Sequence, residues 1–179
     1  GGPGFITLCS TDAAVDMFSW IEGTPDAGGT WSSPSNSGTD NLFDPIVDAP
    51  GTYTYTLNVP PPCTSASTTV TVDVIQPPFA GDDAATTLCI TSGSTALFPL
   101  IGGDPDVGGI WTGPNGTPFD GWFDPSTNGA GVFQYMVNGT APCHADVALV
   151  TVNVVTDPDP GIDGTLTICA TWWVLAPWP

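Results

Sequence analysis

The sequence contains no lysine and no arginine, whereas it contains 18 acidic residues and one histidine, so its formal net charge is −18. About a quarter of the residues of an average protein are charged, and the missing basic residues exclude several functions. A protein without cationic side chains cannot neutralise the phosphates of a nucleic acid or bind anionic lipid through a basic patch. The lysine of a phosphate-binding loop, a Schiff-base lysine and a catalytic arginine are excluded as well.

Long hydrophobic runs are also missing, because no apolar stretch approaches the roughly 18 residues that span a bilayer. We therefore expect no membrane span. The hydrophobic content of 41% and the aromatic content of 10% nevertheless predict a folded protein rather than a disordered one. The sequence begins at Gly1 without a methionine or a signal peptide, and we interpret it as a fragment or a processed product.

The sequence consists of repeats with an offset of 80 residues. When residues 1–80 are compared with residues 81–160 without gaps, 28 of 80 positions are identical. The shared positions include cysteine, tryptophan, phenylalanine and tyrosine pairs: Cys9 and Cys89, Cys63 and Cys143, Trp31 and Trp111, Phe43 and Phe123, and Tyr55 and Tyr135. The tail continues the pattern, since Cys169 lies another 80 residues after Cys89. The chain thus holds two full repeats and the start of a third.

Each repeat shows the pattern of β-strands. Tyr53, Tyr55 and Leu57 alternate with threonines, and Val70, Val72 and Val74 alternate with polar residues in the same way. A period of two with β-branched and aromatic residues predicts half-buried strands. About seven short strands in 80 residues predict an all-β fold, with tandem immunoglobulin-like antiparallel β-sandwich domains in a linear array.

The repeat boundaries predict how the domains are organised. We place the first immunoglobulin-like repeat at residues 1–76 and the second at residues 85–155, with linkers at 77–84 and 156–164. Both linkers are rich in proline and acid, which favours semi-rigid spacers. Residues 165–179 are either the first strand region of a truncated third repeat or a strand that pairs with another subunit.

The five cysteines predict disulfides and an oxidising, extracellular location. The simplest pairing is within repeats, Cys9 with Cys63 and Cys89 with Cys143, which leaves Cys169 unpaired or available to another subunit. A second pairing crosses the repeats, for example Cys63 with Cys89 and Cys143 with Cys169. Zinc is disfavoured, because there is no CxxC spacing and only one histidine.

Acidic residues in the linkers are weak candidates for a calcium site. Asp82, Asp83, Asp157 and Asp159 could supply oxygen ligands between domains, but no calcium-binding motif supports this. We therefore expect no cofactor, with calcium as the open alternative. The repeated acids Asp26, Asp44, Asp106 and Asp124 lie beside prolines or glycines, and we interpret them as turn residues that bond to the local backbone.

The remaining candidates for chemistry or binding are few. His144 and Asp146 could belong to a catalytic triad, but the first repeat has Thr64 and Ala66 there, so we expect no enzyme activity. Trp31 and Trp111 are expected to pack in the core against the disulfides. Tryptophans that do not recur between repeats could stack on sugars, although core or interface packing is the simpler interpretation: Trp20, Trp122 and Trp173. The apolar tail run that includes Trp172, Trp173 and Val174 favours an interface between subunits.

Several segments of the first repeat together resemble a known family. They are the run from Gly23 to Trp31, the motif Phe43-Asp44-Pro45, the strand from Gly51 to Tyr55, the pair Pro62-Cys63 and the strand Val70-Thr71-Val72. They resemble the immunoglobulin-like tandem repeats of large secreted cell-surface adhesins of Bacteroidota, of the gliding-motility adhesin type. The resemblance implies export, display on the cell surface and no catalytic residues.

These observations together predict a structural or adhesive extracellular repeat protein, a segment of a cell-surface stalk, adhesin or filament. Its expected partners are copies of itself or neighbouring repeats, and surface glycans are possible partners as well. The alternatives are a glycan-binding module, which could depend on calcium, and an accessory domain of a larger secreted enzyme.

Overall fold

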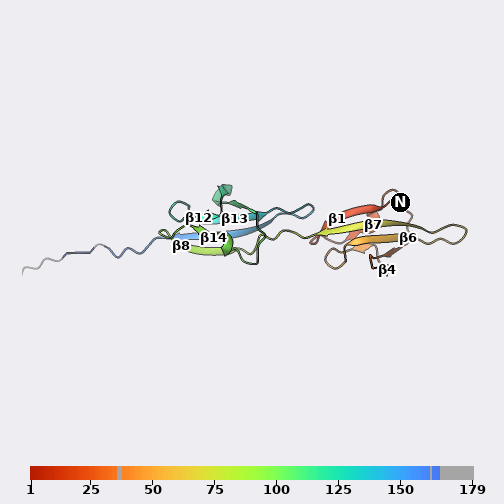
Figure 1. Cartoon of the computed structure of the whole chain (residues 1–179), viewed down its shortest axis with the longest axis horizontal. Helices are drawn as coiled ribbons and strands as arrows, with labels where there is room; N and C mark the ends of the chain where they lie inside the picture. Colours follow the sequence, from red (N-terminus) through yellow and green to blue (C-terminus); the bar gives the residue numbers. More distant parts are fainter. Residues whose placement is uncertain (36–37, 162, 166–179) are drawn as a thin grey trace, which may run out of the picture.

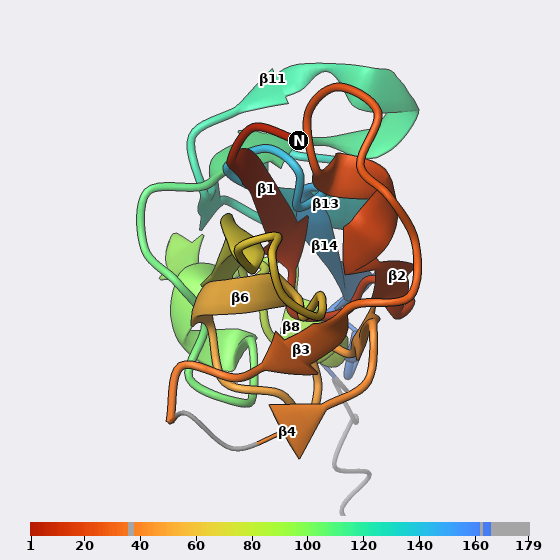
Figure 2. The ribbon, with the colours of Figure 1, turned by 90° about the vertical axis from the view of Figure 1, so that its right-hand side faces the viewer.

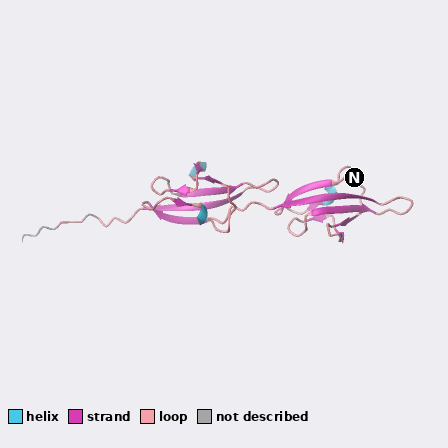
Figure 3. Cartoon of the chain, in the orientation of Figure 1, coloured by secondary structure: helices cyan, strands magenta, loops and turns pink. Residues whose placement is uncertain are grey.

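The computed structural model describes residues 1–35, 38–161 and 163–165 and contains two β-domains. Figure 1 shows the domains end to end along the long axis of the molecule, and the view along that axis places the first domain in front of the second (Figure 2). Strands make up most of the regular structure, and the helical segments are single short 3₁₀ turns (Figure 3).

The first domain consists of two sheets that share one core. A five-stranded sheet has the order β1-β7-β6-β3-β4, and a two-stranded sheet pairs β2 with β5. The strands are β1 (Gly4–Cys9), β2 (Val15–Asp16), β3 (Thr30–Ser32), β4 (Gly38–Thr39), β5 (Leu42–Phe43), β6 (Gly51–Leu57) and β7 (Ala66–Ile75), and the 3₁₀ turn η1 (Met17–Trp20) follows β2.

The second domain repeats this topology. Its five-stranded sheet has the order β11-β10-β13-β14-β8, and its small sheet pairs β12 with β9. The elements are β8 (Ala84–Cys89), β9 (Thr95–Ala96), η2 (Phe98–Leu100), β10 (Ile110–Thr112), η3 (Pro114–Gly116), β11 (Pro118–Phe119), β12 (Trp122–Phe123), β13 (Gly131–Val137) and β14 (Asp146–Val155). Both domains are immunoglobulin-like β-sandwiches, so the predicted fold class is confirmed.

The alternating residues that predicted the strands form the core. Tyr53, Tyr55, Val70 and Val72 of the first domain are buried, as are their counterparts in the second domain: Phe133, Tyr135, Val150 and Val152. In each domain a fully buried phenylalanine of the small sheet, Phe43 or Phe123, packs into the same cluster.

One strand pair in each domain is parallel rather than antiparallel. β1 runs alongside β7 with Cys9 opposite Ile75, and β8 runs alongside β14 with Cys89 opposite Val155. The first cysteine of each repeat therefore lies at the end of the sandwich where the last strand finishes. This placement decides which cysteines can meet.

A tyrosine hydroxyl holds the glycine-rich turn before the third strand in each domain. The Tyr55 hydroxyl donates a 2.9 Å hydrogen bond to the Asp26 carbonyl and accepts one of 2.7 Å from the Gly29 backbone N–H. Tyr135 makes the same two bonds with Asp106 and Gly109. A β-carbon added at Gly29 would lie only 2.5 Å from the Tyr55 ring, which explains why the turn carries glycine there in both repeats.

Tyr53 gives the first domain a predicted sensitivity to alkaline pH. Its hydroxyl donates a 2.8 Å hydrogen bond to the Ala49 carbonyl, and burial followed by the nearby Asp48 carboxylate raises the pKa of Tyr53. The pKa of Tyr53 is higher in the folded state than in the unfolded chain, where it is about 10. The protonated Tyr53 hydroxyl therefore stabilises the folded state fully at pH values below the unfolded pKa. This stabilisation is lost as pH rises through the pKa of Tyr53 in the folded state. We expect Tyr53→Phe to flatten the decline in the free energy of unfolding above pH ~10, as measured by urea denaturation.

The second domain has Phe133 at the position of Tyr53 and serves as an internal control in this experiment. Tyr53→Phe is also expected to cost about 1 kcal/mol near neutral pH, because the hydrogen bond to Ala49 is lost. If the free energy of unfolding declined equally steeply at alkaline pH in the wild-type protein and the variant, Tyr53 would not be the cause of the decline.

Candidate functional site

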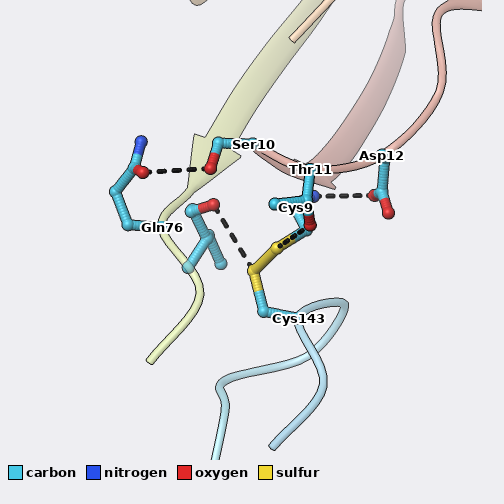
Figure 4. The surroundings of a disulfide bond; sticks show 7 residues. Cys9, Ser10, Thr11, Asp12, Gln76 and Cys143 are labelled. Atoms are coloured by element: carbon cyan, nitrogen blue, oxygen red, sulfur yellow. Dashed lines mark hydrogen bonds between the residues drawn. A yellow bond between two sulfur atoms is a disulfide. The ribbon is translucent and has the colours of Figure 1, made fainter. Parts of the chain in front are cut away.

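A disulfide between Cys9 and Cys143 joins the two domains. The two Cα atoms are 5.0 Å apart, and the bond links residues separated by 134 positions in the sequence. Figure 4 shows Cys9 at the end of β1 and Cys143 on the loop between β13 and β14. Both cysteines are almost completely buried, with exposed fractions of 2% and 6%. The junction between the repeats is therefore the candidate functional site.

The predicted pairing within repeats is wrong, because the two cysteines of one repeat lie at opposite ends of its sandwich. Cys9 lies opposite Ile75, the last residue of β7, whereas Cys63 precedes Ala66, the first residue of β7. The ten residues of β7 extend over ~30 Å, and a disulfide requires Cα atoms within about 7 Å. The same geometry separates Cys89 from Cys143.

The alternative pairing across the repeats is also wrong. Cys143 is bonded to Cys9 and not to Cys169, and Cys63 and Cys89 are not bonded to each other. Cys63 and Cys89 are free and exposed thiols. Cys169 lies outside the described residues, as do Trp172, Trp173 and Val174.

Local hydrogen bonds fix the backbone around Cys9. Its N–H donates a 2.8 Å bond to the Asp12 carboxylate, and the N–H of Ser10 donates to the Ile75 carbonyl at 2.8 Å. The Ser10 hydroxyl donates to the side-chain oxygen of Gln76 at 2.9 Å (Figure 4). The Sγ atom of Cys143 lies 3.4 Å from the Ile75 carbonyl oxygen, so the second domain contacts the last residue of β7 directly.

The segment between the domains is bound to the second domain by backbone hydrogen bonds. Phe79 donates its N–H to the Asp106 carboxylate at 2.9 Å and accepts a bond from the Asp106 N–H at 2.8 Å. The N–H of Ala80 donates to the Asp146 carboxylate at 2.7 Å, and the Ala80 side chain is completely buried. Ala80 therefore packs in the core of the second domain, whereas Phe79 is held to that domain through its backbone and leaves its side chain 40% exposed.

Among the residues that the structure describes, no hydrogen bond joins Asp146 to His144. One Asp146 oxygen accepts the Ala80 N–H, which assigns this carboxylate a structural role at the junction. His144 is exposed and lines the same cleft of about 430 Å³ as Phe79 and the two bonded cysteines.

The linker acids do not converge on a common point. Asp83 accepts the N–H of Leu149 at 2.8 Å, and Asp159 accepts the N–H of Gly161 at 2.8 Å. Asp82 pairs through its backbone with Gly102, and Asp157 is exposed. Across residues 1–35, 38–161 and 163–165, no three His, Cys, Asp or Glu side chains are grouped so as to hold a metal ion.

Two of the four repeated acids of the turns, Asp44 and Asp124, bond to the local backbone as predicted, whereas Asp26 and Asp106 do not. Asp44 and Asp124 each accept an N–H from two residues ahead, at 2.9 Å in both domains. The hydroxyl of Ser126 also donates to Asp124 at 2.6 Å. This bond, and to a lesser extent the bond from the Ser126 backbone N–H, lowers the pKa of Asp124. Asp106 binds the linker, and Asp26 contributes its carbonyl to the tyrosine bond described above.

The tryptophans fall into two groups. Trp31 and Trp111 are buried and lie 5.1 and 5.0 Å, between ring centroids, from Tyr55 and Tyr135. Core packing is confirmed, but their predicted disulfide partners are wrong, because the disulfide lies at the junction. Trp20 and Trp122 are exposed by 44% and 57%, and Trp122 borders a shallow surface hollow together with Asp120 and Asn128.

Asp146 is a junction residue whose role the sequence reasoning missed. The first repeat has Ala66 at its position, so the departure from the repeat was the available signal. Phe79 lies in the predicted linker, and the sequence carries no signal for the two hydrogen bonds that its backbone makes to Asp106.

Comparison with known proteins gives similarities of fold only. No protein-family profile and no curated protein matches the sequence. Among solved structures, the chain is similar to an E-to-A variant of a three-Ig structure of titin, with a TM-score of 0.45 and 15% identity over 86% of this chain and 63% of that chain. It is also similar to murine CEACAM1b, with a TM-score of 0.39 and 14% identity over 83% and 96% of the two chains. The N-terminal four Ig domains of Dscam1 isoform 6.9 give a TM-score of 0.41 and 13% identity over 86% and 44%.

The chain spans less than two thirds of the length of the titin structure. With these scores, the comparisons carry no conclusion about activity or partners. Among the residues that the structure describes, no helix has the length and apolarity needed to cross a bilayer.

Proposed function

We propose that this chain is a segment of an extracellular stalk, adhesin or filament, in which immunoglobulin-like repeats act as a structural spacer without catalysis. The observation that carries the proposal is the Cys9–Cys143 bond, because it fixes one repeat to the next. A flexible string of independent domains needs no such bond, whereas a spacer that must keep its direction does.

The location outside the cell rests on two further observations. A stable disulfide is typical of proteins that fold in an oxidising compartment. The complete absence of lysine and arginine removes every site of trypsin-like cleavage, which suits a protein exposed to secreted proteases. The resemblance of the repeats to those of secreted Bacteroidota adhesins supports the same location.

Surface labelling of the native source cells tests this proposal. Antibodies against the second domain should label intact cells without permeabilisation. Protein extracted in the presence of N-ethylmaleimide should carry the alkylating group on neither Cys9 nor Cys143, because both sulfurs are already bonded. A cytosolic protein of known location, labelled only after permeabilisation, serves as the control. Labelling confined to permeabilised cells, or alkylation of both cysteines, would contradict the proposal.

A further inference from the structure

The two free thiols occupy the same repeat positions as the two bonded cysteines. Cys89 lies 80 residues after Cys9, and Cys63 lies 80 residues before Cys143. Each bonded cysteine is nearly buried at the junction, whereas Cys63 and Cys89 are free and exposed. The Cys9–Cys143 bond therefore indicates the kind of disulfide that Cys89 and Cys63 can form with a further repeat.

The local structure around Cys89 reproduces that around Cys9. The Ile90 N–H donates to Val155 at 2.9 Å, as the Ser10 N–H donates to Ile75 at 2.8 Å. The carbonyl of each cysteine accepts an N–H from three residues ahead, at 2.9 Å in both domains. Cys63 lies in the loop between β6 and β7, which corresponds to the loop between β13 and β14 that carries Cys143.

The free thiols cannot pair with each other within one chain. Cys63 precedes β7 at the end of the first domain that faces away from the second. Cys89 is the last residue of β8, at the end of the second domain that faces away from the first. At ~3.3 Å per strand residue, two ten-residue strands and the segment between them separate these ends by far more than the length of a disulfide. Their partners must therefore lie outside this pair of domains.

We propose that Cys89 of one copy forms a disulfide with Cys63 of a second copy, so that the chains join head to tail through a repetition of the Cys9–Cys143 junction. The two ends are complementary because one carries the Cys9-type half and the other carries the Cys143-type half. Such a contact is heterologous and does not close on itself, so it propagates into a linear filament. The inference extends the proposed spacer function, but its test does not depend on where the protein is located.

The chemistry of the surfaces permits this contact despite the negative net charge. On the Cys63 side, Thr64, Ser65 and Ala66 replace His144, Ala145 and Asp146 of the formed junction, so the one acid among these three positions is absent there. On the Cys89 side, Ser92 replaces Asp12. Repulsion between whole chains is long-range and is screened by salt, so joining should be faster at high ionic strength.

The bond needs an oxidant, and a small disulfide such as oxidised glutathione is sufficient. The Cys89 thiolate attacks oxidised glutathione and releases one glutathione thiol. The Cys63 thiolate of the second copy then displaces the second glutathione from the mixed disulfide. Two cysteine thiols lose two protons and two electrons, and one glutathione disulfide becomes two glutathione thiols.

The test uses the full chain with Cys169→Ser, so that only Cys63 and Cys89 remain as free thiols. Incubation with oxidised glutathione in 0.5 M salt should give a ladder of multiples of 18.3 kDa on a non-reducing gel, and reductant should collapse it. Because trypsin cannot cut this chain, pepsin digestion and mass spectrometry identify the linked peptides. Random collision of two equally reactive thiols would make half of the intermolecular bonds Cys63–Cys89, so we expect this bond to exceed nine tenths of the total.

Matched variants decide the outcome. With Cys63→Ser or Cys89→Ser added, each protein alone should stay largely monomeric, whereas a mixture of the two should give a single dimer band. A Cys63–Cys89 share of half or less would overturn the proposal, as would a wild-type protein that stays monomeric under oxidation. Both substitutions change exposed side chains, and circular dichroism verifies that each variant is folded.

Discussion

When the protein is pulled from its two ends, the oxidised form is expected to extend far less than the reduced form. Tension that enters at the N-terminus reaches Cys9 and passes through the disulfide to Cys143. Residues 10–142 therefore carry no tension, even after their domains unfold. Reduction adds the sequence separation of 134 residues to the stretched length, ~480 Å at ~3.6 Å per residue. Single-molecule force spectroscopy with handles attached by a method that avoids cysteine measures this difference directly.

Two substitutions provide the controls for the pulling experiment. Cys143→Ser should behave like the reduced protein under oxidising conditions, because it removes the bond between the domains. Cys63→Ser should behave like the oxidised wild-type protein, because Cys63 takes no part in the Cys9–Cys143 bond. An oxidised wild-type protein that releases the long extension would show that the tension does not follow the disulfide.

This route of tension connects the junction to the proposed function. β6 and β7 of the first domain, and β8 and β13 of the second, all lie within the closed loop. The strands within the loop can unfold and refold without lengthening the chain between Cys9 and Cys143. A spacer built in this way keeps its length under forces that would extend a simple string of domains.

The β-sandwich could be predicted from the sequence because the signals for it are local. The alternation around Tyr53 and Val70 determines which face of each strand is buried, and the structure buries that face in both repeats. The 80-residue repeat then doubles each signal.

The disulfide pairing could not be predicted from spacing, because it depends on the direction of two strands that are distant in the sequence. Cys9 ends the first strand of its domain, and Cys63 precedes the last one. If these strands are parallel neighbours, the two cysteines lie at opposite ends of the domain; if they are antiparallel, the cysteines lie at the same end. The sequence gives no separate signal for the parallel pairing of β1 with β7, so the simplest assignment failed.

Removal of one core phenylalanine is expected to unfold one domain and leave the other folded. Phe123 is completely buried and contacts Phe133 edge to face, with 5.3 Å between ring centroids. Truncation of a buried phenylalanine typically costs about 3–5 kcal/mol, a large part of the 5–15 kcal/mol that stabilises a typical domain. In Phe123→Ala we therefore expect β13 and β14 to lose hydrogen-exchange protection at a denaturant concentration at which β6 and β7 keep theirs.

The repeat supplies a matched pair of variants for this experiment. Phe43→Ala removes the equivalent fully buried ring from the first domain and should reverse the pattern of protection. Trp122→Ala changes the neighbouring, 57% exposed residue of the same strand and should shift stability by no more than about 0.5 kcal/mol. Equal loss of protection in both domains of Phe123→Ala would mean that the junction couples them into one cooperative unit. The disulfide would then transmit folding stability as well as tension, and unfolding one repeat would weaken the next.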